Sequence, residues 1–131
     1  MGIAEALFDR LSGVAAITAI VGTDPVGIYP DQAPPKPGSR HIVMEIDEDD
    51  PQHAMGADHE DRRAGVRLYC YGATRDEAQA LADEVIDALR RYSGTHDTTV
   101  IDDCYSQGHR AIVEDDLKPV VRLVQFDVAY H

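Results

Sequence analysis

The chain has 131 residues, 44 % hydrophobic and 27 % charged, which is typical of one globular domain and argues against global disorder. Its 24 acidic and 12 basic residues give a net charge of −12, which repels nucleic-acid phosphates and anionic membranes. The longest apolar stretch, residues 14–21, is far shorter than the roughly 20 residues that span a bilayer. We therefore expect one domain over residues 1–131, with no secretory signal and no stable binding of nucleic acid or membrane.

The first part of the chain predicts two short helices and a short strand. Apolar residues recur at helical spacing over residues 2–12, and residues 15–21 predict a second helical turn that stops at Gly22. Residues 28–29 can start a strand. Three prolines and a glycine follow within residues 31–38, which excludes pairing in a sheet and predicts a loop.

Two predicted strands then enclose a long acidic segment. Residues 41–46 are rich in β-branched side chains, and apolar and polar residues alternate over residues 66–71, so both segments are predicted strands. The intervening residues 47–63 show no apolar periodicity. The simplest arrangement is an antiparallel hairpin with an extended tip. A loop of this length is uncommon unless it is functional or disordered, so it is the best local candidate for function.

The stretch YCYGATRDEAQALAD, which starts at Tyr69, poses a choice between a reactive site and a strand-to-helix junction. Cys70 lies on the apolar side of its strand, and a thiol buried in apolar surroundings is inert. Thr74 and Glu77 match a capping box, which fills the helix N-terminus with the protein's own carboxylate and repels an anionic ligand. We therefore predict a junction, followed by a long helix over residues 75–92.

The remaining residues predict mainly strands. Gly94 is expected to end the long helix, and residues 98–104 and 109–113 predict two strands joined by a turn at 106–108. Residues 120–130 predict a final strand with one apolar side. The resulting fold class is α+β, with a mostly antiparallel sheet, one long helix packed on it and a short N-terminal helix.

The acidic loop shows no arrangement that is specific for a metal, a cofactor or catalysis. The calcium-binding pattern of alternating carboxylates is missing, and His53 and His59 are six residues apart, which fits no common zinc spacing. Because charge runs are most often solvated, we expect no catalytic residue, no cofactor and no metal site. The carboxylates that we single out as a candidate assembly surface are Asp47, Glu48, Asp49, Asp50, Asp58, Glu60 and Asp61.

Three stretches together resemble one family of proteins from tailed bacteriophages. IAEALFDRLSGVAAITAIVGTDPVGIYP, residues 3–30, is similar to the family's opening pattern of a short helix, small residues, V-G and a strand with I-Y-P. VRLYCYGATRDEAQALADEVIDALR, residues 66–90, is similar to its central strand, its Y-x-A-x-(S/T) junction and the following helix. VVRLVQFDVAYH, residues 120–131, is similar to its final aromatic strand. The likeness covers nearly the whole chain and keeps the order.

The family is that of the tail terminators and tail-completion, or head–tail joining, proteins of long-tailed bacteriophages. The resemblance implies a non-enzymatic structural protein of the virion, assembled in the bacterial cytoplasm. Its copies would form a ring, commonly a hexamer, at the head-proximal end of the tail tube. The ring would end tube polymerisation and join the tail-tube protein to a head-completion or connector protein. DNA would pass through as cargo, and the acidic loop would face this channel or a partner.

Two other interpretations remain open from the residues alone. The acidic loop over residues 47–61, with His53 or His59, could belong to a small metal-binding, ligand-binding or enzymatic domain. A bacterial adaptor domain without a role in a phage would also fit the composition. A ring that forms with rising concentration and without a cofactor would favour the phage protein. A monomer that binds a metal or a metabolite would favour the second interpretation.

Overall fold

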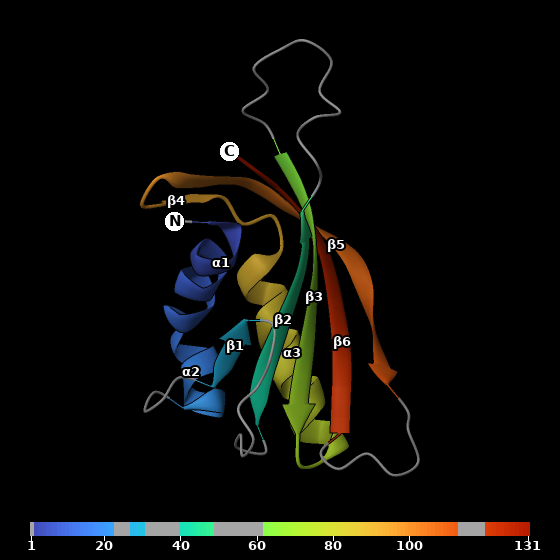
Figure 1. Ribbon diagram of the computed structural model, residues 1–131. Helices are drawn as coiled ribbons and strands as arrows, with labels where there is room; N and C mark the ends of the chain where they lie inside the picture. The colour runs from blue at the N-terminus through green and yellow to red at the C-terminus, as the bar shows by residue number, and fades with distance from the viewer. Residues whose placement is uncertain (1, 23–26, 31–39, 49–61, 113–119) are drawn as a thin grey trace.

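The computed structural model describes residues 2–22, 27–30, 40–48, 62–112 and 120–131. Within these residues, three helices lie against one face of a six-stranded sheet, which curls around them (Figure 1). The elements in chain order are α1 (Ile3–Ser12), α2 (Ala15–Val21), β1 (Ile28–Pro30), β2 (His41–Glu48), β3 (Arg62–Gly72), α3 (Arg75–Leu89), β4 (Gly94–His96), β5 (Thr99–Ile112) and β6 (Val120–Tyr130). The first two helices and the last strand lie where the sequence predicts them, so the α+β class is confirmed.

The sheet is mixed, with one parallel pairing at the edge of the mostly antiparallel arrangement that the sequence predicts. Its strands lie in the order β1-β2-β3-β6-β5-β4, and β1 runs parallel to β2 while the other neighbours are antiparallel. At the centre, β3 and β6 pair from Arg62 opposite Tyr130 to Gly72 opposite Val120. The direction of β1 was not predictable, because a strand of three residues carries no alternation from which its partner or direction can be read.

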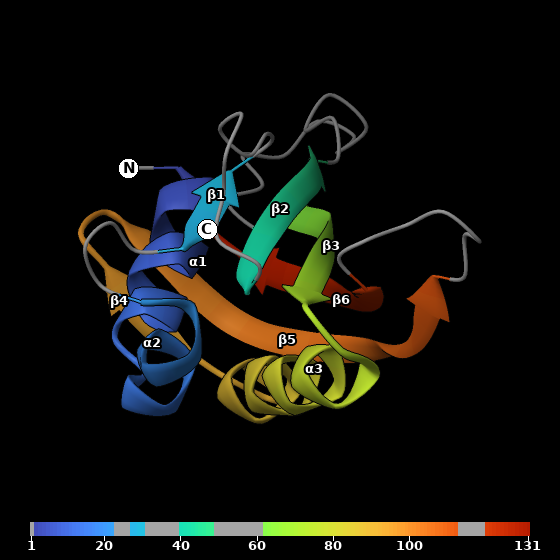
Figure 2. The same ribbon diagram turned by 90° about the horizontal axis from the view of Figure 1, so that it is seen from below.

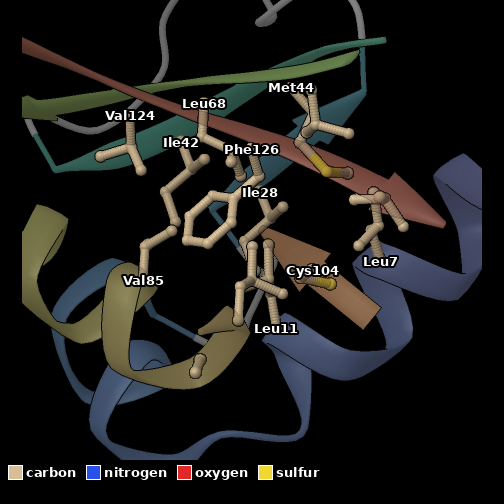
Figure 3. Packing of buried hydrophobic residues seen from close by; sticks show 14 of the residues in the cluster. Leu7, Leu11, Ile28, Ile42, Met44, Leu68, Val85, Cys104, Val124 and Phe126 are labelled. Carbon is tan, nitrogen blue, oxygen red and sulfur yellow. The ribbon is translucent and has the colours of Figure 1, made fainter. Parts of the chain in front are cut away.

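The core lies between the helices and the sheet. Figure 3 shows side chains of the central strands, those of Leu68, Val124 and Phe126, pointing toward Val85 of α3. Leu7 of α1 packs at the other end of the core. Figure 2 shows that β5 is strongly curved, passing along α3 and then around α1. As a result, α1 contacts β1 at one edge of the sheet and β4 and β5 at the other. Full burial of a side chain of this size contributes about 1.5–3 kcal/mol, so these contacts hold the helices on the sheet.

The stretch that starts at Tyr69 is a strand-to-helix junction, as predicted. The Glu77 N–H donates to Thr74 Oγ1 at 3.2 Å, and the Thr74 N–H donates to Glu77 Oε2 at 3.1 Å, which completes the capping box. Gly72 precedes this cap, and a Cβ there would collide with the backbone N of Ala78. The glycine is therefore required by the close approach of α3 to β3, and it has no part in binding an anion.

The helix predicted over residues 75–92 is shorter than expected, because α3, the last of the three helices, ends at Leu89. Arg91 adopts a φ of 55° and donates its N–H to the carbonyl of Cys104 on β5. The chain therefore leaves the helix to hydrogen-bond with the sheet. Gly94 is not the helix stop that was predicted but the first residue of β4.

Three strands are longer than the sequence predicts. The predicted turn at 106–108 is a bulge within one continuous strand, β5, whose register with β6 shifts between Ser106 and Gly108. Gly108 has a φ of 106°, a conformation that glycine adopts readily and that a turn and a bulge both use, so the sequence could not separate them. β2 and β3 also extend into the predicted loop over residues 47–63. The residues of that loop that lie in strands are Asp47, Glu48, Arg62 and Arg63.

Both cysteines are free thiols inside the core. Cys70 of β3 and Cys104 of β5 have no exposed surface. Burial raises the pKa of each thiol to about 12, so neither is a thiolate near neutral pH. Because the thiolate is the nucleophile, neither cysteine can act as one in the folded protein. The prediction of a buried, inert Cys70 is confirmed.

The cap and the buried face of α3 should contribute unequally to stability. Thr74→Ala should lower the free energy of unfolding by about 1 kcal/mol, because one cap hydrogen bond is lost. Leu81→Ala and Leu89→Ala should each lower it by about 2–5 kcal/mol, because truncation of a fully buried leucine leaves a cavity. Urea unfolding followed by circular dichroism measures all three, with Ala80→Ser on the exposed side of α3 as control. A Leu89→Ala protein as stable as that control would contradict the assigned burial.

Stability should fall as the pH rises above the ordinary thiol pKa of about 8.5. Unfolded thiols ionise there, whereas the buried ones stay protonated up to a pKa of about 12. The unfolded state then binds fewer protons than the native state, so the free energy of unfolding declines by up to about 1.4 kcal/mol per pH unit per cysteine. Urea unfolding at several pH values gives this slope. The Cys70→Ala/Cys104→Ala variant should be less stable at neutral pH but show a shallower slope, and equal slopes would contradict the account.

Candidate assembly surface

The face of the sheet opposite the helices carries two groups of side chains. Side chains alternate along a strand, so the neighbours of the core residues in β2, β3 and β6 all point to this face. What we call the polar half consists of Glu45, Asp47, Arg67, Gln125, Asp127 and Gln107. What we call the apolar half consists of Tyr29, His41, Val43, Tyr69, Tyr71, Val121 and Leu123.

Arg67 is at the centre of the polar half. Its Nη2 donates to Glu45 Oε1 and to Asp47 Oδ2, at 2.9 Å in each case, so one cation bridges two carboxylates of the neighbouring strand. Asp47 and then Glu45 raise the pKa of the Arg67 guanidinium above its ordinary value. The Asp47 side chain nevertheless remains 72 % exposed. Its carboxylate therefore keeps acceptor positions that another protein can use.

The polar half continues onto β6 and β5 as an open groove of about 310 Å³ beside Arg67. Gly65 pairs with Asp47 and adds no side chain, which leaves the groove open at that point. On the far side, Gln107 Nε2 donates to Asp127 Oδ2 at 2.9 Å. Small-molecule pockets are mostly apolar and enclosed, whereas this groove presents carboxylates and amides to solvent. It is suited to hydrogen bonding with the surface of another protein.

Contacts between aromatic rings connect the side chains of the apolar half. The rings of His41 and Tyr71 stack with centroids 4.2 Å apart and planes at 8°, and Tyr29 of β1 approaches His41 at 5.9 Å. Burial, and to a lesser extent Glu45, raises the pKa of Tyr69, so its hydroxyl stays neutral. Protein interfaces are enriched in tyrosine and depleted in charge at their centres. His41, Val121 and Leu123 are already buried in the single chain, whereas Tyr29, Tyr69 and Tyr71 are half-buried. These three tyrosines and the polar half beside them therefore resemble the centre and the rim of a contact surface.

The structure describes two of the seven predicted loop carboxylates. Asp47 belongs to the polar half, and Glu48 is the last residue of β2, opposite Ala64. The other predicted residues lie outside the described residues, as do the two histidines of that loop: Asp49, Asp50, Asp58, Glu60, Asp61, His53 and His59. Of the predicted candidate site, only Asp47 can be placed among interacting side chains.

Five residues of the polar half are absent from the predicted site. They come from four strands that are far apart in the sequence, and only the pairing of β2 with β3, of β3 with β6 and of β6 with β5 joins them. On β2, β3 and β6 a usable signal existed, because the polar residues stand two apart between core residues, as on the solvent-facing side of a strand. The missed residues are Glu45, Arg67, Gln125, Asp127 and Gln107.

A second polar cluster has the outline of a catalytic triad but links structural elements. Asp9 Oδ2 of α1 lies 2.7 Å from Nδ1 of the buried His96, whose Nε2 lies 2.7 Å from the Tyr92 hydroxyl. The Arg10 guanidinium lies 4.2 Å above the Tyr92 ring. A Cβ at Gly94 would collide with the same tyrosine hydroxyl, so Tyr92 packs closely against the start of β4. These contacts tie α1 and the end of α3 to β4.

In residues 2–22, 27–30, 40–48, 62–112 and 120–131, no three His, Cys, Asp or Glu side chains are grouped as metal ligands. Over the same residues, no helix is both long and apolar enough to cross a membrane. The features that do stand out are a filled core and a broad strand face with an aromatic and a charged half. They define the class of a structural subunit that contacts other proteins.

Comparison with known proteins identifies the family within that class. The family described as tail completion protein gp17 matches residues 5–131, so the chain belongs to this family. The protein is accordingly a structural component of the phage tail. The resemblance found in the sequence is thereby confirmed. No curated protein matches the chain.

Two solved structures show the same fold. A chain from the virion of a native gene transfer agent (GTA) particle has a TM-score of 0.73 at 19 % identity, covering 98 % of this chain and 93 % of that one. The bacteriophage SPP1 gp17 protein has a TM-score of 0.54 at 14 % identity, covering 95 % of this chain and 86 % of that one. At such low identity the likeness extends to the arrangement of the sheet and helices and not to individual side chains.

Proposed function

We propose that copies of this chain close into a ring, most simply a hexamer, at the head-proximal end of the tail tube. The ring ends polymerisation of the tube and provides the surface to which the head is joined. Its neighbours are the tail-tube protein on one side and a head-completion or connector protein on the other. Membership of the tail-completion family is the observation that carries this proposal.

The two faces of the sheet support a role as a ring subunit. The helices cover one face and bury the core, which leaves the polar half and the half-buried tyrosines of the opposite face for contacts with other proteins. On that face, the rings of Tyr69 and Tyr71 lie on the same strand as Arg67, which bridges Asp47 and Glu45. Aromatic groups give contact area, and charged groups fix register and exclude wrong partners. A subunit that must recognise several different neighbours requires both kinds of group.

The net charge of −12 fits a channel through which DNA passes as cargo without specific binding. In a ring, the loop carboxylates of neighbouring copies come near one another, and like charges repel unless water, salt or a basic partner separates them. We place the loop that starts at Asp47 at the channel or against a basic surface of a partner. A negatively charged wall would keep DNA from adhering as it moves.

Neutralising the start of this loop should affect assembly and not folding. In a variant with Asp47→Asn, Glu48→Gln, Asp49→Asn and Asp50→Asn, the melting temperature should stay close to that of the wild type, because exposed ion pairs contribute little to stability. Joining of heads to tails, or infectivity of a phage that carries the variant, should fall. A variant that unfolds, or that loses a tightly bound metal, would instead support the metal-binding interpretation of the loop.

The ring itself is tested by mass in solution. Native mass spectrometry and sedimentation over a range of concentrations should give a closed oligomer whose mass is a multiple of 14.4 kDa. Added to tail-tube protein during polymerisation, the protein should limit the length of the tubes and bind one end only. A protein that stays monomeric at every concentration and leaves tube length unchanged would overturn the proposal.

A further inference from the structure

Among the described residues, the outer edge of β5 is open over most of its length. β4 pairs only with Thr99 to Ile101, and no other described strand lies beside the residues that follow up to Ile112. An unpaired strand edge is a template for strand addition, and most proteins shorten or cover such edges. The opposite edge of the sheet is formed by β1, which ends in Pro30 and is only three residues long. The edge at β5 therefore offers a longer unpaired stretch among the described residues than the edge at β1.

One residue at this edge, Ser106, has backbone groups that are directed outward and could pair with another strand. The outward carbonyl of Cys104 already accepts from the Arg91 N–H, and the Cys104 N–H already donates to Asp103 Oδ1. Peptide groups alternate between the two edges of an antiparallel strand. Ser106, two residues further along, therefore directs its N–H and C=O to the same open edge.

A groove runs between this edge and α3. Ser106 lines one side and Asp83, Ile86, Asp87 and Arg90 of α3 line the other, around a volume of about 360 Å³. Ile86 gives the groove an apolar floor, and two carboxylates against one guanidinium leave its wall with a net negative charge. A groove between a strand edge and a helix is the geometry in which extended segments add a strand to a sheet. The segment that this groove fits is extended and basic.

The same chain carries such a segment at the start of β3. Arg62 and Arg63 are both exposed, and neither forms an ion pair with the described residues. They pair with Tyr130 and Ala129 of β6, whereas the described part of β2 begins its pairing only at Ala64. The side of these two arginines away from β6 is therefore unpaired among the described strands. The segment lies at the end of the sheet nearest the C-terminus (Figure 1).

We propose that the groove between β5 and α3 of one copy receives the start of β3 of the next copy. Because side chains alternate along a strand, one of Arg62 and Arg63 would face Asp83 and Asp87, while the backbone near Ser106 pairs with the incoming strand. The inference rests on the proposed ring and names the surfaces that join its subunits. A contact between two different surfaces repeats head to tail, which is the type of contact that closes into a ring.

Charge reversal on either surface tests the contact. The groove variant, Asp83→Lys/Asp87→Lys, and the strand variant, Arg62→Glu/Arg63→Glu, should each raise the concentration needed for assembly at least about tenfold, because like charges then meet. The groove variant should fold normally, since both aspartates are exposed and lysine at position 87, in the last turn of α3, is favoured over aspartate. Glu84→Lys makes the same change of charge as each groove substitution, on the same helix outside the groove, and should assemble like the wild type.

Mixing the two variants gives the decisive result. The lysines of one variant then face the glutamates of the other, and the unaltered aspartates face the unaltered arginines, so an equimolar mixture should assemble into rings of alternating copies. Native mass spectrometry would show equal numbers of the two chains. Restored assembly also demonstrates that both variants are folded. A mixture that stays dissociated would overturn the proposal, as would single variants that assemble like the wild type.

Hydrogen exchange tests the strand pairing. In the assembled wild type, the amide of Ser106 should exchange more slowly than in the dissociated strand variant, because it donates to the neighbouring copy. Equal exchange in the two states would exclude strand addition at this edge. If the wild type never assembles, the ring and this contact both fail. If it assembles while the variants and the exchange are unaffected, only this contact fails.

Discussion

The pairing of β3 with β6 is the interaction on which the rest of the structure depends. These two strands lie at the centre of the sheet and pair along their whole length. Because side chains alternate, this one register sends Leu68, Val124 and Phe126 into the core and Arg67 and Gln125 to the opposite face. A slip of one residue would exchange the core and the contact surface together, so folding and recognition are fixed by the same hydrogen bonds.

The curl of the sheet adds the second constraint. Because β5 sweeps beneath the helices, α1 can contact both edges of the sheet, and the cluster of Asp9, His96 and Tyr92 fastens it there (Figure 2). Beyond its first residues, the curved β5 no longer pairs with the short β4. Part of its edge beside α3 is therefore without a partner strand among the described residues. The curvature of β5 therefore accounts both for the core enclosed between the helices and the sheet and for the open edge of β5.

Groups that suggest chemistry are put to structural use in this chain. The thiols of Cys70 and Cys104 are buried and protonated, and the glycine before α3 makes room for the helix. The triad-like cluster connects α1 and the end of α3 to β4. What remains for function is a set of surfaces, which accords with a family of tail-completion proteins. Function here follows from where charged and aromatic side chains meet solvent, and the fold alone does not dictate it.

The sequence by itself determined the elements with strong periodicity: α2, β6, the start of α3 at Thr74 and the burial of Cys70. It also determined the family, because the order of these apolar patterns survives where individual residues change. Only the tertiary structure decided the direction of β1, the end of α3 at Leu89 and the continuity of β5 through its bulge, since each depends on hydrogen bonds to a distant strand. The tertiary structure also decided which residues form the polar half. Arg67 and Asp47 become partners only when β2 and β3 pair, and no local pattern encodes that register.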